Sequence, residues 1–151
     1  MAVAQLTEKQ EVVILLAEDD LGHARLIEKN LRRANITNKI VVVHDGQAVV
    51  DYLFASQEGE EHRPLPLLVL LDLNMPVLDG YQVLQRMKAD ERTKRIPVVI
   101  LTTTDDPREV GRCYDLGCNV YITKPVDYAQ FSEAVRQLGL FLSVVTIPHN
   151  R

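Results

Sequence analysis

The stretch Leu67-Leu68-Val69-Leu70-Leu71-Asp72 decides the fold of this chain. Five apolar residues follow one another and end in an acid, a pattern typical of a strand that is buried on both faces of a parallel sheet. A second apolar run covers residues 12–17 and also ends in acid, at Glu18-Asp19-Asp20. Between the two runs, apolar residues recur at helical spacing. The pattern therefore predicts strands that alternate with helices.

The rest of the chain continues this alternation. Five strands alternating with five helices indicate an α/β protein with a doubly wound, five-stranded parallel sheet, the flavodoxin-like (βα)5 arrangement. Asp20 is the expected N-cap of the first helix. The strands are expected at about 12–17, 40–44, 67–71, 98–102 and 120–122. Four helices are expected at about 21–34, 45–55, 107–117 and 128–142, and one more follows Gly80 with Val83, Leu84 and Met87 facing inward.

Length and composition indicate one domain. The 151 residues suffice for a single core, which we place at 12–142, preceded by a polar arm at 1–11 and followed by an apolar tail at 143–151. A net charge of −4 argues against binding to nucleic acid or to an anionic membrane through bulk charge. The chain shows neither a signal peptide nor an apolar run that could span a bilayer, so we expect a cytoplasmic protein.

The two cysteines, Cys113 and Cys118, fall in one segment that has the pattern of a helix followed by a turn. A redox pair is one interpretation of this spacing. We favour the other, in which both are small buried hydrophobic residues in a reducing compartment.

Polar side chains collect where the expected strands end. Ligands of parallel sheets bind outside the carboxyl ends of the strands, so Glu18, Asp19 and Asp72 should meet in one crevice. Carboxylates at that range repel one another, and a hard divalent cation would relieve the repulsion. We expect Mg²⁺, or Mn²⁺, on Asp19, Asp72 and the main-chain carbonyl of Asn74, with Glu18 acting through water.

Two further side chains complete a phosphoryl-transfer set. Asp72 can attack phosphorus and carry the group as an acyl phosphate. The Thr102 hydroxyl can donate to a phosphoryl oxygen, and Lys124 supplies a positive charge where negative charge accumulates. Each residue alone is explained as well by helix capping or a loop. Five complementary residue types at one sheet edge are harder to explain in that way.

These motifs resemble the receiver domains of two-component response regulators over about residues 12–138. The resemblance implies that a histidine kinase phosphorylates Asp72, that Glu18 and Asp19 hold Mg²⁺, and that Thr102 and Lys124 bind the phosphoryl group. It also implies an aromatic switch at Tyr121 and a cis peptide bond before Pro125. One departure is Thr103, where the family usually has a smaller residue. The matching motifs are Leu16-Ala17-Glu18-Asp19-Asp20, Asp72-Leu73-Asn74-Met75-Pro76-Val77-Leu78-Asp79-Gly80, Ile100-Leu101-Thr102-Thr103-Thr104 and Thr123-Lys124-Pro125-Val126.

A narrower resemblance is to the stand-alone regulators of bacterial and cyanobacterial phytochrome kinases. It rests on the loop at 57–66, the stretch 114–125 and the apolar tail. About a dozen residues follow the last helix, too few for an attached output domain, so we expect signalling by protein contact rather than enzyme activity. We also expect a homodimer, whose interface would include five tail residues: Phe141, Leu142, Val144, Val145 and Ile147.

Other functions fit the sequence less well. A Mg²⁺-dependent aspartyl phosphatase or phosphotransferase usually carries its nucleophile on the first strand, with a second acid two residues later. Here that later residue is Asn74. A receiver-like scaffold without phosphorylation is disfavoured because all five residues are present. A nucleotide-binding protein is disfavoured because no Gly-rich loop follows the first strand.

Overall fold

The computed structural model describes residues 13–33, 36–55, 66, 68–124 and 128–137. Five parallel strands form one sheet in the order β2-β1-β3-β4-β5. The strands are β1 (Val13–Ala17), β2 (Lys39–Val43), β3 (Leu68–Asp72), β4 (Val98–Thr102) and β5 (Val120–Thr123). The helices are α2 (Leu21–Arg33), α3 (Gly46–Val50), the π-helix η1 (Asp51–Ala55), α4 (Gly80–Lys88), α5 (Pro107–Asp115) and α6 (Tyr128–Gln137).

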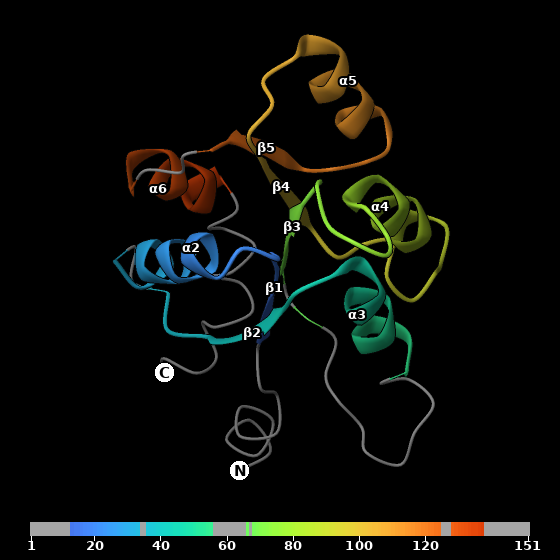
Figure 1. The fold of residues 1–151 in the computed structure, drawn as a ribbon, viewed down its shortest axis with the longest axis horizontal. Coiled ribbons are helices and arrows are strands. Elements are labelled where there is room, and N and C mark those ends of the chain that lie inside the picture. The colour runs from blue at the N-terminus through green and yellow to red at the C-terminus, as the bar shows by residue number, and fades with distance from the viewer. Residues whose placement is uncertain (1–12, 34–35, 56–65, 67, 125–127, 138–151) are drawn as a thin grey trace.

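The sheet lies between two layers of helices (Figure 1). Helix α2 covers one face beside α6, and α3, α4 and α5 cover the other face. Strands β1, β3 and β4 are buried along their whole length because helices pack on both of their faces. This burial explains their uninterrupted apolar sequences. The doubly wound parallel fold predicted from the sequence is confirmed.

The strand order reverses at β1. From β1 the chain crosses to β2 on one side, and β3 then pairs with β1 on the other side. The connections that follow β1 and β3 therefore leave the sheet in opposite directions. A crevice opens between them at the carboxyl edge, where ligands of such sheets bind.

Several elements differ from the sequence prediction by one or two residues at their ends, and one helix differs in type. The helix expected at 45–55 is a short α-helix, α3, that continues as the π-helix η1. Two consecutive residues of η1, Tyr52 and Leu53, are both buried in the core. Strand β3 ends one residue later than expected, because Asp72 pairs with Leu101 of β4.

Both cysteines are buried and free, as predicted. Burial raises the pKa of the Cys113 thiol to about 11 and that of Cys118 to about 12. Such thiols are protonated at neutral pH and react slowly. The described helices include none that is long and apolar enough to cross a membrane.

Candidate functional site

The candidate site lies at the carboxyl edge of the sheet, where main-chain bonds hold its residues in place. The Glu18 N–H donates to the Val43 carbonyl at 3.0 Å, so β1 stays bonded to β2 beyond its last residue. In the same way the Lys124 N–H donates to the Thr102 carbonyl at 2.6 Å. Since the backbone is fixed at these points, the side chains that follow β1 and β5 enter the crevice from defined positions.

Three carboxylates share the crevice. Glu18, Asp19 and Asp72 each offer an oxygen within 4.8 Å of the other two. Glu18 and Asp72 are almost fully buried, with exposed fractions of 1% and 4%, whereas Asp19 is exposed. The structure therefore brings together the three acids that the sequence predicted would meet.

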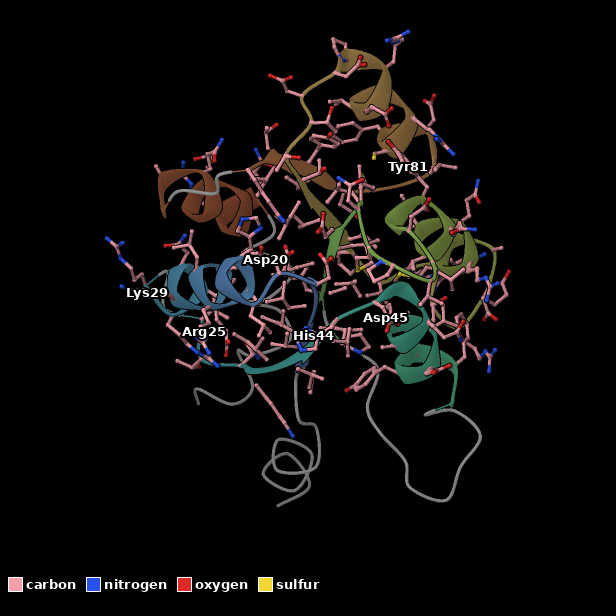
Figure 2. All side chains as sticks on the ribbon, viewed as in Figure 1. Asp20, Arg25, Lys29, His44, Asp45 and Tyr81 are labelled. Atoms are coloured by element: carbon pink, nitrogen blue, oxygen red, sulfur yellow. The ribbon has the colours of Figure 1, made fainter. Side chains whose placement is uncertain are left out.

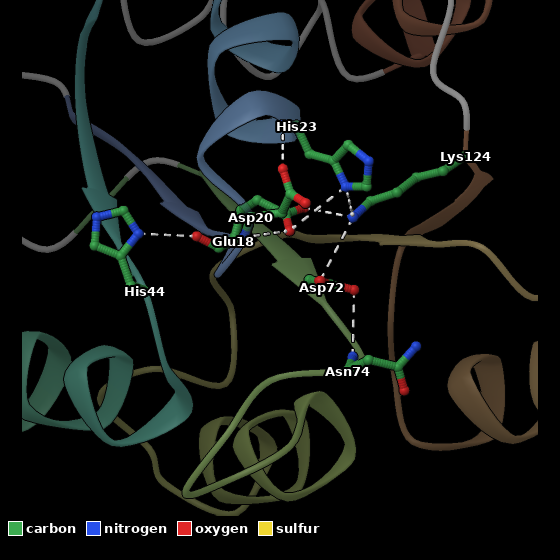
Figure 3. Close-up of polar contacts among 7 residues, drawn as sticks. All are labelled: Glu18, Asp20, His23, His44, Asp72, Asn74 and Lys124. Atoms are coloured by element: carbon green, nitrogen blue, oxygen red, sulfur yellow. Dashed lines mark hydrogen bonds and ion pairs between the residues drawn. The ribbon is translucent and has the colours of Figure 1, made fainter.

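The Lys124 ammonium lies among these acids (Figure 3). Its Nζ is 2.5 Å from Glu18 Oε1 and 3.5 Å from Asp72 Oδ2. The side chain is only 6% exposed, so these ion pairs are shielded from water. Truncating one partner of such a pair would leave the other as an uncompensated buried charge.

The pKa of Asp72 reflects this environment. Burial raises it to about 6, and the negative charge of Glu18 adds to the rise. Two contacts act in the opposite direction: the charge of Lys124, and the Asn74 N–H, which donates to Asp72 Oδ1 at 3.2 Å. Asp72 is thus a carboxylate that a positive charge would stabilise further.

The donor set fits a small divalent cation. Carboxylate oxygens are the ligands that Mg²⁺ and Mn²⁺ prefer, and these cations usually bind one or two carboxylates together with water. Asp19 is exposed, so water can reach the carboxylate that would bind the cation at the surface. The residues that would hold the cation are Asp19 and Asp72, with Glu18 at its edge.

Thr102 ends β4 next to the crevice. Its side chain is completely buried, and its hydroxyl has no hydrogen-bond partner among the described residues. A buried hydroxyl without a partner costs about 1–3 kcal/mol. The Thr102 hydroxyl is therefore a hydrogen-bond donor at the edge of the sheet whose acceptor is not among the described residues.

We compared the chain with known protein families. The family model of the response regulator receiver domain matches residues 14–136. The chain belongs to the response regulator receiver family.

Relatives of this receiver include stand-alone regulators. It is 39% identical over 138 residues to response regulator Rcp1 of Synechocystis, covering 90% of this chain and 92% of Rcp1. A crystal structure of the Mn²⁺-bound form of Rcp1 aligns with a TM-score of 0.71 at 38% identity, over 87% of this chain and 94% of that one.

Two further crystal structures align closely. A receiver domain from Rhodospirillum rubrum is 55% identical with a TM-score of 0.70, over 88% of this chain and 94% of that one. The phosphorylated cyanobacterial phytochrome response regulator RcpA is 38% identical with a TM-score of 0.73, over 89% of this chain and 96% of that one.

Tyr121 of the receiver lies on β5 and is half-buried. Its hydroxyl donates to the main-chain carbonyl of Thr104 at 2.7 Å. Burial raises the pKa of Tyr121 to about 12, so the phenol keeps the proton that makes this bond. The bond connects β5 to the loop that follows Thr102.

The loop after Asp72 is held at several points. The Gly80 N–H donates to the Leu73 carbonyl at 2.9 Å, and the Gly46 N–H donates to the Pro76 carbonyl at 3.4 Å. A Cβ on Gly80 would lie 2.6 Å from the Asp72 carbonyl oxygen, so only glycine allows this approach. Asp79 and Gln82 form a capping box at the start of α4, which anchors the far end of the loop.

Val77 lies at the tip of the same loop with φ +71°. The Leu78 N–H donates to the Pro76 carbonyl at 2.8 Å across it, which gives the three-residue geometry of a γ-turn. A β-branched residue at positive φ is a genuine conformational outlier.

One contact of the site does not follow from the sequence. The His23 side chain is 47% exposed, yet its Nδ1 lies 3.2 Å from Lys124 Nζ. Its place in the first turn of α2, five residues after Glu18, is the one sequence signal of this position. The expected cis bond at Pro125 and the expected dimer residues between Phe141 and Ile147 lie outside the described residues.

Proposed function

We propose that this receiver accepts a phosphoryl group on Asp72 from a histidine kinase, in a reaction that requires Mg²⁺ or Mn²⁺. The observation that carries the proposal is the buried contact of Lys124 with both Glu18 and Asp72. The Lys124 ammonium lies beside Asp72, the carboxylate that would attack phosphorus. It also lies beside Glu18, the carboxylate that would help to hold the cation. The Mn²⁺-bound form of the relative Rcp1 supports the choice of cation.

The chemistry follows from the residues. An oxygen of Asp72 attacks the phosphorus of the donor, a P–O bond forms, and the P–N bond of the phosphohistidine breaks with its electron pair going to the imidazole nitrogen. Lys124 and the unpartnered Thr102 hydroxyl stabilise the charge on the phosphoryl oxygens. A divalent cation held by Asp19 and Asp72 would supply additional positive charge to the same oxygens.

The partner we propose is a phytochrome-type histidine kinase in the cytoplasm. The support is similarity to Rcp1 and to RcpA, the second of which is a phytochrome response regulator. We propose that the receiver is not itself an enzyme for other substrates and that it signals by protein contact. Thr103, which is exposed beside Thr102, would influence how water reaches the acyl phosphate.

We also propose a homodimer through the face formed by β5 and α6. Strand β5 is an edge of the sheet, and beside it a groove of about 480 Å³ lies against α6, lined by residues that include Tyr121, Ile122 and Ala129. Sedimentation velocity on the full chain and on a chain that ends at residue 140 tests this. We expect the full chain to dimerise and the shortened chain to be monomeric, and a monomeric full chain would contradict the proposal.

Intact-mass spectrometry tests the phosphorylation. After treatment with acetyl phosphate, the protein should gain one phosphoryl group when Mg²⁺ is present and none in EDTA. The Asp72→Asn variant should gain none. Lys124→Ala should slow the reaction by about 100- to 1000-fold, the range for loss of one charge-stabilising donor. Undiminished labelling of Asp72→Asn would overturn the assignment.

A further inference from the structure

His23 is the third partner of the Lys124 ammonium (Figure 3). A lysine ammonium has three N–H donors and no acceptor. Here Nζ has three acceptors within reach: Glu18 Oε1 at 2.5 Å, His23 Nδ1 at 3.2 Å and Asp72 Oδ2 at 3.5 Å. Since Nζ can only donate, this contact is a hydrogen bond when Nδ1 carries the lone pair, which is the tautomer with its proton on Nε2.

The position of His23 is set by the main chain. Its N–H donates to Asp20 Oδ1 at 2.9 Å, in the first turn of α2. Asp20 caps this helix, so the helix start and the imidazole are fixed together. The ring therefore reaches Lys124 from a rigid element on the side of the crevice away from Asn74.

His23 differs from Glu18 and Asp72 because it has no expected role in binding the cation or the phosphoryl group. Glu18 and Asp72 are the carboxylates that turn toward a bound cation and a phosphoryl group in the proposed function. His23 has neither task. Among the described partners of Lys124, it is the one that would stay available if Glu18 and Asp72 took up those tasks.

We propose that His23 is a positioning residue, which keeps the Lys124 ammonium over Asp72 while the phosphoryl group is taken up. Without it, the long and flexible lysine side chain would keep only its 3.5 Å contact with Asp72 once Glu18 turned away. Lysine side chains lose substantial rotamer entropy when they are ordered. His23 reduces this loss at the moment of transfer, and the inference rests on the proposed phosphorylation of Asp72.

The first test is the single-turnover rate of phosphorylation by acetyl phosphate at saturating Mg²⁺. His23→Ala should slow it by roughly three- to tenfold, the range that one ordinary hydrogen bond supplies. His23→Gln, which keeps an acceptor oxygen, should recover more than half of the loss. The dissociation constant for Mn²⁺, measured by calorimetry, should stay within about twofold, because His23 is outside the cation's donor set.

The control variant is Arg25→Ala. Arg25 is exposed and lies further along the same helix (Figure 2), so this variant should phosphorylate at the wild-type rate. In a Lys124→Ala background, His23→Ala should cause no further slowing, since a positioning residue acts only through the group that it positions. Equal slowing in both backgrounds, or a wild-type rate for His23→Ala, would overturn the inference.

A metal-free measurement separates this inference from the proposed function. Long-range ¹H–¹⁵N spectra at about pH 8, where a free imidazole is neutral, should show His23 Nδ1 as the unprotonated nitrogen, with a resonance that moves in Lys124→Met. A protonated Nδ1, or an unmoved resonance, would overturn the His23–Lys124 contact. A wild-type protein with this signature that took up no phosphoryl group would instead overturn the proposed function.

Discussion

The Tyr121 hydroxyl and the Thr104 main-chain carbonyl are joined by a hydrogen bond of 2.7 Å. Tyr121 belongs to the edge strand β5, and Thr104 lies two residues beyond the end of β4. The bond therefore couples the loop beside the buried hydroxyl of Thr102 to the outer edge of the sheet. A change in one should be transmitted to the other, as the resemblance to receiver domains implied for Tyr121.

Replacing Tyr121 with Phe should remove this bond and little else. We expect the free energy of unfolding to fall by about 1 kcal/mol, the net contribution of one hydrogen bond. Urea denaturation measures this change in the free energy of unfolding. Tyr114→Phe is the matched control, because Tyr114 is an exposed tyrosine on α5 and its hydroxyl should contribute little. Equal effects of the two substitutions would contradict a role for the Tyr121 bond.

The raised pKa of Asp72 predicts how stability depends on pH. With a pKa of about 6 in the folded protein and an ordinary value of 3.8 for the unfolded chain, the folded state binds the proton more tightly. The associated stabilisation is complete below pH 3.8 and is lost as the pH rises through about 6. Without divalent cations, Asp72→Asn should therefore be more stable than the wild type by about 1–3 kcal/mol at neutral pH.

The same difference should shrink toward zero near pH 4, because both side chains are then neutral. Addition of Mg²⁺ should stabilise the wild type more than Asp72→Asn, since the variant lacks one carboxylate of the cation site. Chemical unfolding at several pH values provides the measurement. A stability difference that does not change with pH would show that Asp72 is not the group responsible.

Val77 should be a site where glycine stabilises the protein. Its φ of +71° is unfavourable for valine, and its side chain is 73% exposed, so little packing is lost on truncation. We expect Val77→Gly to raise the free energy of unfolding by about 0.5–1.5 kcal/mol, after the entropy cost of glycine. Val77→Ala, which keeps a Cβ, should gain less than half of that. A loss of stability in Val77→Gly would argue against a strained γ-turn.

Two glycines should respond in opposite ways to alanine. A Cβ on Gly80 would lie 2.6 Å from the Asp72 carbonyl oxygen, whereas a Cβ on Gly111 meets nothing within 4 Å. We expect Gly80→Ala to destabilise the protein by about 2 kcal/mol or more and to slow phosphorylation, since the acceptor strand must shift. Gly111→Ala, in the exposed middle of α5, should stabilise by about 0.5–1 kcal/mol.

Leu26 should distinguish the kinase from a small phosphoryl donor. It is 43% exposed on α2, the helix that begins at the mouth of the crevice, where a phosphohistidine must approach Asp72 in line. Leu26→Glu should slow transfer from the cognate kinase by about tenfold or more, as expected when a charge is placed in an interface. Phosphorylation by acetyl phosphate should be unchanged. Equal losses with both donors would indicate misfolding.

The placement of the acids and of Lys124 could be predicted because parallel strands end at one edge of the sheet. Apolar runs identified the strands, and the residue after each run then identified the crevice. Apolar periodicity predicts which face of a helix is buried, but not which polar side chain of its first turn reaches across the crevice, so the contact of His23 with Lys124 required the structure. The π-helix after Val50 and the γ-turn at Val77 were missed for a related reason: packing against the rest of the fold imposes them, and local preference does not.

The bonds on the two sides of the crevice are unequal, and amide hydrogen exchange should reveal the difference. After β3, the N–H groups of Asn74, Leu78 and Gly80 are all bonded, so they should exchange slowly. Across the crevice, the loop after β4 is held by the tyrosine bond to the Thr104 carbonyl and by the Asp106 N–H, which donates to Thr104 Oγ1 at 3.2 Å. Phosphorylation or cation binding should therefore change amide exchange rates most at residues 103–106. The loop that follows Asp72 should keep its slow exchange and serve as the fixed reference for that movement.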